Sequence, residues 1–84
     1  MEKRIGTITI LIHDRSKAAE INQIISGHAQ VVLCRQGLPF HDSNVAVISL
    51  IVEGTANEIN ALTGPLGRVQ DVECKAVMTK PKEN

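Results

Sequence analysis

The order in which two hydrophobic periods alternate along the chain constrains the fold more than any other feature. Four segments have the two-residue period or the unbroken apolar character of β-strands: residues 4–13, 31–38, 45–53 and 69–79. Apolar residues at helical spacing lie between the first and second strands and between the third and fourth. The order βαββαβ, with right-handed crossovers, predicts an α+β, ferredoxin-like sandwich. Its antiparallel four-stranded sheet has the order 4-1-3-2, with both helices on one face.

The two predicted helices have distinct start and stop signals. Asp14 can cap the first helix, and Gly27 can end it. Thr55 and Glu58 form a capping box for the second helix. The segment TGPLG, residues 63–67, is expected to break that helix in a Schellman-type stop. A phosphate cradle is disfavoured there, because the segment lacks a lysine and follows a helix C-terminus.

The third strand is apolar on both of its faces, so it should be central and covered twice. The helices of one chain cover only one face of the sheet. The other face should expose the predicted interface residues, which are Leu11, Val45, Val47 and Ile51. Such a face normally meets a partner, and we expect two copies to pack sheet to sheet as a homo-oligomer, either a dimer or a tetramer. Phe40 is the only aromatic residue among 84, and a small aliphatic core also favours self-association.

The stretch CRQGLPFHD, residues 34–42, joins the second strand to a hairpin that should lie beside His13 and Asp14 at one end of the sandwich. Arg35 could bind the carboxylate of an effector in a bidentate pair, and Gly37 could expose a backbone amide. The alternative is a β-bulge at Gly37 with a solvated arginine.

Metal chemistry has only weak support in this sequence. His13, Cys34 and His41 are candidate ligands if neighbouring chains contribute, but no C-x-x-C or H-x-x-x-H spacing is present. Cys34 is predicted to point inward as a small core residue. Cys34 and Cys74 fall on opposite edge strands, roughly 14 Å apart, which excludes a disulfide within one chain. We expect no cofactor and no metal in a single chain.

Charge and hydropathy exclude several classes of partner. Nine Lys plus Arg balance nine Asp plus Glu, so direct nucleic-acid binding is not expected. No apolar run approaches the roughly 20 residues that span a bilayer, and the start lacks a signal-peptide pattern, so no membrane partner and a cytoplasmic location are expected. Residues 1–80 should form one domain, and residues 81–84 a disordered tail.

Two motifs are similar to those of a known family. An R-x-G-x-P-aromatic stretch closes the second strand, and an L-T-G-x-L-G helix end precedes the last strand. The matching residues are Arg35, Gly37, Pro39, Phe40, Leu62, Thr63, Gly64, Leu66 and Gly67. Over nearly its whole length the chain resembles the iron-only hydrogenase system regulators, which are small ACT-like domains. Cys74 departs from the family's usual aliphatic residue, and His41 with Asp42 departs from its usual charged pair.

The resemblance implies an ACT-like fold, self-association and a regulatory role. It implies no catalytic residues, and no nucleophile–base arrangement is present, so the chain is not expected to be an enzyme. We expect an oligomeric module that binds a small effector or a partner protein at a subunit interface, without a DNA-binding segment of its own. The candidate ligand-binding residues are Arg35, Gly37, Pro39, Phe40, Thr63 and Gly64. The alternative is a metal-sensing module that uses His and Cys ligands across chains.

Overall fold

The computed structural model describes residues 2–79 and contains the predicted elements in the predicted order. The predicted tail, residues 81–84, lies outside the described residues. Single 3-10 turns at Arg15–Lys17 and Ala29–Val31 flank the first helix. The main elements are β1 (Arg4–Ile12), α1 (Ala18–Ser26), β2 (Val32–Pro39), β3 (Ala46–Gly54), α2 (Ala56–Gly67) and β4 (Val72–Met78).

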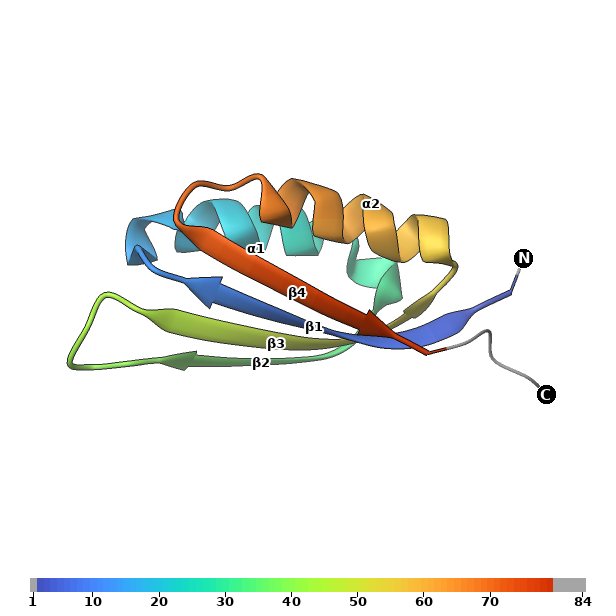
Figure 1. The fold of residues 1–84 in the computed structure, drawn as a ribbon, viewed down its shortest axis with the longest axis horizontal. Helices are drawn as coiled ribbons and strands as arrows, with labels where there is room; N and C mark the ends of the chain where they lie inside the picture. Colours follow the sequence, from blue (N-terminus) through green and yellow to red (C-terminus); the bar gives the residue numbers. More distant parts are fainter. Residues whose placement is uncertain (1, 80–84) are drawn as a thin grey trace.

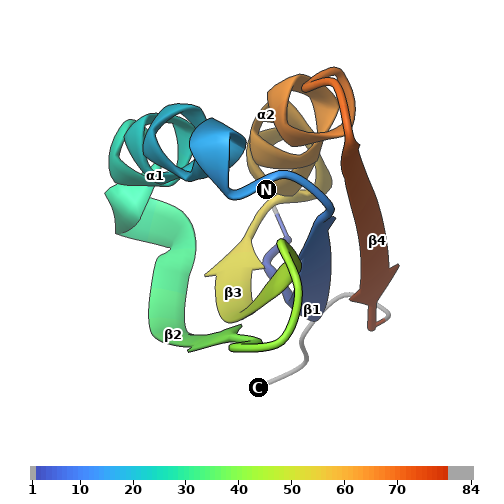
Figure 2. The ribbon, with the colours of Figure 1, turned by 90° about the vertical axis from the view of Figure 1, so that its left-hand side faces the viewer.

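The four strands form one antiparallel sheet of order β2-β3-β1-β4. This is the predicted order 4-1-3-2 read from the other edge, so the predicted ferredoxin-like architecture is confirmed. Both helices lie on one side of the sheet (Figure 1). Seen along the strands, α1 covers the β2 half and α2 the β4 half, and no element of residues 2–79 covers the opposite face of the sheet (Figure 2).

The core is aliphatic and lies between the sheet and the helices. Alternate residues of the two central strands point into it, as the two-residue period predicted. Within residues 2–79, no polar or charged residue is buried. The buried core residues are Ile8, Ile10, Ile12, Ile21, Ile25, Val31, Ile48, Leu50, Val52, Ile59, Leu62, Leu66 and Val69.

The predicted break of α2 at TGPLG is wrong. The helix continues to Gly67 with Pro65 inside it, and its last turn closes through the bonds Arg68 N to Pro65 O (3.2 Å) and Val69 N to Leu66 O (3.4 Å). No described glycine has a positive φ, so no Schellman stop forms. Leu66 is fully buried, and its packing outweighs the backbone N–H that Pro65 lacks.

The predicted bulge at Gly37 is also wrong, because the irregularity of β2 lies nearer to its start. Gly37 pairs regularly with Ile48, whereas the register shifts between Val32 and Cys34. The extra residue in β2 reverses which face every later residue of the strand occupies. Cys34 therefore lies opposite Ile51 and is exposed, so the prediction of a core cysteine is wrong.

No helix within residues 2–79 has the length and apolar character that crossing a membrane would require.

Candidate functional site

The face of the sheet that points away from the helices, here called the outer face, is organised in rows of residues that oppose one another across the strands. Residues in register on neighbouring strands share a face, so the strand pairing defines the rows directly. The middle row is polar, and the rows on either side of it are mixed. The rows are Leu38–Val47–Leu11–Glu73, then Gln36–Ser49–Thr9–Lys75, then Cys34–Ile51–Thr7–Val77.

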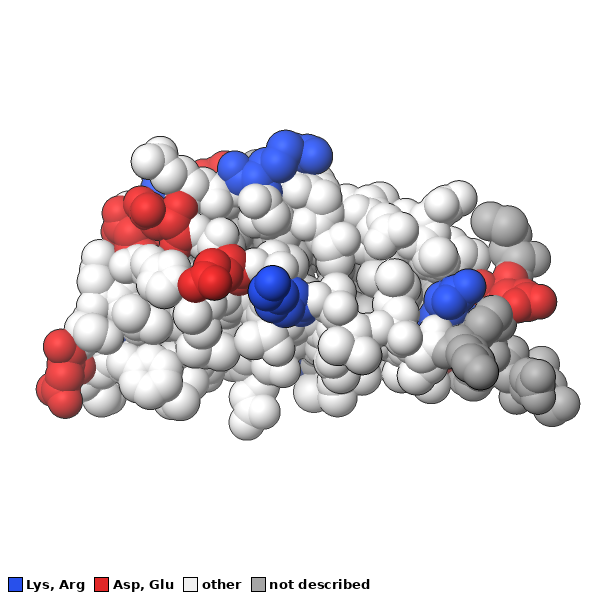
Figure 3. Space-filling view, in the orientation of Figure 1, with Lys and Arg blue, Asp and Glu red and all other residues white. Residues whose placement is uncertain are grey.

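The large apolar side chains that water reaches are all found on the sheet or its hairpin. Within residues 2–79 no helix contributes one. Figure 3 views the molecule from the β4 side, where a few acidic and basic side chains stand out from a largely uncharged surface below the helices. The predicted interface residue Ile51 is exposed, and the predicted residues Leu11, Val45 and Val47 are half-buried. The exposed residues are Ile5 (38%), Leu33 (61%), Leu38 (58%), Phe40 (45%), Ile51 (42%) and Val77 (71%).

A hollow of about 390 Å³ lies on this face at the β2–β3 hairpin. Two of the predicted ligand-binding residues, Gly37 and Phe40, line it. The sequence did not indicate Gln36, Leu38 or Ser49 as ligand-binding residues, and it indicated Val47 only as an interface residue. Val47 and Ser49 reach the hollow through the pairing of β3 with β2. The lining residues are Gln36, Gly37, Leu38, Phe40, Val47 and Ser49.

The other predicted ligand-binding residues lie elsewhere. Arg35 is opposite Leu50 on the helix-facing side, and its guanidinium donates to the Asn22 side-chain oxygen of α1. Thr63 and Gly64 lie within α2, over the other half of the sheet (Figure 2), and the Thr63 hydroxyl is 3.4 Å from the Asn60 carbonyl oxygen. Pro39 ends β2 opposite Ala46. The structure does not bring the six predicted residues to one site, and a carboxylate site at Arg35 stays a prediction.

The predicted meeting of residues 13–14 with the hairpin is confirmed. The Asn44 amide nitrogen donates to an Asp14 carboxylate oxygen at 3.2 Å, and the Arg15 guanidinium donates to the Phe40 carbonyl. The Ser16 backbone N–H also binds Asp14, and chiefly this bond lowers the pKa of that carboxyl. These contacts fix the hairpin to the end of β1.

The candidate metal ligands do not form a cluster within one chain. The His13 Nε2 atom is 2.6 Å from a Glu73 carboxylate oxygen, Cys34 lies on β2, and His41 lies in the hairpin turn. Among residues 2–79, no three His, Cys, Asp or Glu side chains are placed to hold an ion. Partial burial raises the pKa of the Cys74 thiol, which disfavours the thiolate that metal binding needs. Ligation across chains stays a prediction.

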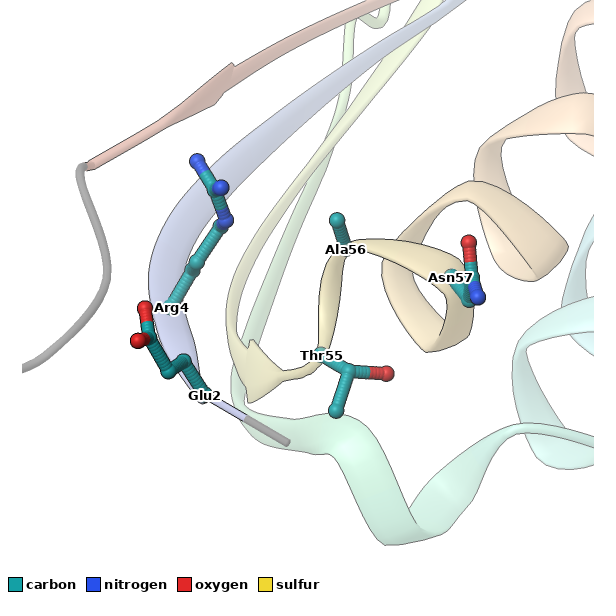
Figure 4. Close-up of a pocket in the computed structure, with 5 residues that line it drawn as sticks. All are labelled: Glu2, Arg4, Thr55, Ala56 and Asn57. Atoms are coloured by element: carbon teal, nitrogen blue, oxygen red, sulfur yellow. The ribbon is translucent and has the colours of Figure 1, made fainter.

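A second pocket, of about 280 Å³, lies at the opposite end of the molecule, where β1 begins and α2 starts. Its polar side chains point apart rather than toward a common centre (Figure 4). The predicted capping box occupies the start of α2, with Glu58 N to Thr55 Oγ1 at 3.2 Å and Thr55 N to Glu58 Oε1 at 2.8 Å. This pocket is therefore part of the helix cap rather than a ligand site.

The capping box makes the free energy of unfolding depend on pH, because Glu58 acts in it as a carboxylate. The backbone N–H of Thr55, and then its hydroxyl, hold the pKa of Glu58 below its ordinary value of 4.5. A carboxyl with a lowered folded-state pKa stabilises the fold above pH 4.5, and this contribution disappears as pH falls through the folded-state pKa. We expect wild type to exceed Glu58→Gln in unfolding free energy near neutral pH, and the gap to close in acid. Urea unfolding of both proteins across this range measures it, and a gap independent of pH would contradict the assignment.

Comparison with known proteins gives one family and several shared folds. A family model described as "Iron-only hydrogenase system regulator, putative", of the TM1266-like type, matches residues 4–76. The solved structure of TM1266 from Thermotoga maritima is 35% identical, covers 94% of this chain and 100% of its own, and superposes with a TM-score of 0.87. No curated protein matches the chain.

Two other solved structures are similar in fold alone. CutA1 from Oryza sativa is 16% identical, with 98% of this chain and 85% of that chain covered and a TM-score of 0.55. The cofactor-independent oxygenase SnoaB from Streptomyces nogalater is 7% identical, with 100% and 97% covered and a TM-score of 0.56. At such identities the likeness to an oxygenase says nothing about the chemistry of this chain.

Proposed function

The chain belongs to the TM1266-like family, and on that premise we propose that it is a self-associating regulatory module of an iron-only hydrogenase system. In this proposal two copies pack through their outer faces, and a small effector or a partner protein binds at the interface between them. The family description supports the regulatory role, and the uncovered sheet supports the association.

This proposal rests mainly on the apolar side chains that are exposed on the outer face. Ile51 sits on a central strand of the sheet and is 42% exposed, and Val77 on the edge strand is 71% exposed. Large apolar side chains that are exposed on the uncovered face of a small sheet are typical of a surface that meets a partner. Two such faces can pack about 10 Å apart, as in a β-sandwich, and remove these side chains from water.

Pairing through the outer face would allow an effector to regulate the protein by changing the fraction of paired copies. An effector that binds only the paired form stabilises that form, so its concentration shifts the balance between single and paired copies. A partner protein that competes for the outer face would shift the balance in the opposite direction. The response requires no catalytic step.

Thermal unfolding with a panel of amino acids, nucleotides, iron and nickel salts, and uncharged ring compounds such as benzamide tests the effector part of the proposal. A ligand at a hundred times its dissociation constant adds about 2.7 kcal/mol to the free energy of unfolding, which raises the melting temperature of a domain of this size by roughly 10–20 °C. We expect at least one member of the panel to raise it. A melting temperature that no member moves would contradict effector binding, and the metal salts separately test the metal-sensing alternative.

A further inference from the structure

The described residues that line the hollow at the β2–β3 hairpin are all uncharged, and one polar pair interrupts its apolar walls. Leu38, Phe40 and Val47 form the apolar part. Gln36 and Ser49 lie directly opposite each other on neighbouring strands. A volume of about 390 Å³ falls within the range of roughly 300–1,000 Å³ found for small-molecule sites, which are usually apolar with a few polar groups.

The polar pair is free to bind a ligand. Within residues 2–79, neither the Gln36 amide nor the Ser49 hydroxyl forms a hydrogen bond to another protein group, and both side chains are exposed. An amide presents one acceptor and two donors, and a hydroxyl both accepts and donates. A ligand edge that carries both a donor and an acceptor could therefore bind the pair.

Phe40 is held in position although it lies beyond the end of β2. Its backbone N–H donates to the Val45 carbonyl at 3.0 Å. Its own carbonyl accepts from the Arg15 guanidinium and from the Ser43 N–H at 3.4 Å. The backbone of Phe40 is thus anchored beside the hollow, and its side chain, which is nearly half exposed, is the only Phe, Tyr or Trp ring of the sequence and offers a flat apolar surface for stacking.

Among residues 2–79, no cation lines the hollow to hold a negatively charged ligand. Arg35 points to the opposite side of the sheet, where it binds Asn22, and Arg15 is engaged with the Phe40 carbonyl. Lys75 shares the row of Gln36 but stands on the far edge strand, three strand spacings or roughly 14 Å away. Asp42, two residues beyond Phe40, would repel an anion.

We propose that this hollow binds an uncharged planar ring compound, which stacks on Phe40 and hydrogen-bonds to Gln36 and Ser49. This inference rests on the proposed function, because it names the chemical class of the effector and its site. A second copy packed on the outer face would close the hollow over the bound ring. The residues of the R-x-G-x-P-aromatic stretch then have different tasks, since Phe40 contacts the ligand and Arg35 binds α1.

Benzamide and benzoate form a matched pair of probes, because they have the same ring and differ in charge. Amide proton–nitrogen NMR spectra of the full chain, recorded up to about 10 mM of each probe, locate and measure binding. We expect benzamide to shift the amide signals of residues 36–38, 40 and 47–49 saturably, and benzoate to bind at least about tenfold more weakly. Equal binding of the two probes, or benzamide shifts spread over the whole outer face, would overturn the proposal.

Matched variants identify the contacts. Ser49→Ala should raise the dissociation constant of benzamide about fivefold, whereas Thr9→Ala removes the neighbouring hydroxyl of the same row outside the hollow and should leave it unchanged. Phe40→Ala should raise it about tenfold, and Leu33→Ala, an exposed apolar truncation outside the lining, should not. If a variant in the lining and its control outside the lining change the dissociation constant of benzamide equally, the assigned contact is overturned.

Sedimentation of the same samples separates this inference from the proposed function. A paired protein that does not bind benzamide, because a side chain of the second copy fills the hollow, would overturn the ligand site and leave association standing. A single-copy protein that binds benzamide at residues 36–40 and 47–49 would support the site and contradict the association.

Discussion

Replacing Gly6 with valine is expected to lower the free energy of unfolding by at least about 2 kcal/mol. Gly6 is buried in β1 between its two neighbouring strands. A Cβ atom at this position would lie 2.9 Å from the Val77 carbonyl oxygen and 3.4 Å from a methyl carbon of Val52. The first contact is with backbone, so β4 would have to move away from β1 to admit the side chain.

Gly37→Val is the matched control, since it makes the same change in another strand. A Cβ atom at Gly37 would have no neighbour within 4 Å. Valine suits an extended backbone and restricts the unfolded chain, so this variant should be neutral or slightly more stable. Urea unfolding gives both values, and a Gly6→Val midpoint equal to that of Gly37→Val would contradict the close approach of β1 and β4.

Ile51→Lys is expected to raise the dissociation constant of the paired protein at least about thirtyfold. Ile51 lies on the central strand β3, opposite both Thr7 and Cys34 on the outer face. In the proposed packing a charge at this position would be taken out of water without a partner, which is costly. In a single copy the same side chain is 42% exposed, so the fold should tolerate the lysine.

Ala61→Lys controls for the added charge, because Ala61 is exposed on α2 and away from the outer face. Sedimentation should find this variant paired as in wild type and Ile51→Lys as single copies. Circular dichroism should find both folded. Loss of pairing in both variants, or in neither, would contradict an interface on the outer face.

The order and type of the elements could be predicted because local signals agree with the tertiary structure. The alternation of Ile8, Ile10 and Ile12 faces the core, and the capping box of Thr55 and Glu58 forms as expected. Right-handed crossovers then leave few ways to connect the strands, so the sheet order followed. The exposure of apolar residues on the outer side of β3 could also be predicted, because one layer of helices covers only one face of a sheet.

One error arose where tertiary packing outweighs local preference, and two arose from a bulge that the sequence does not mark. Gly64 and Pro65 are poor helix residues, yet α2 continues through them because Leu62 and Leu66 are buried against the sheet. The bulge near Leu33 carries no glycine or proline that would mark it. Because one extra residue reverses the faces of a strand, the prediction from the sequence put Cys34 on the wrong face of the sheet.

The hollow could be predicted only in part. Gly37 and Phe40 stood out in the sequence as unusual residues of a hairpin, and both line it. Gln36 and Ser49 are thirteen positions apart and join through the register of β2 with β3, which follows from the bulge. Val77 likewise reaches the outer face only through its pairing with Thr7.

Sedimentation equilibrium of the wild-type protein over a range of concentrations tests the central claim most directly. A chain of 9.1 kDa that hides its outer face against a second copy should sediment with twice that mass, or a higher even multiple, at micromolar concentration. A mass of 9.1 kDa that persists to millimolar concentration would contradict the association on which the proposed regulation depends.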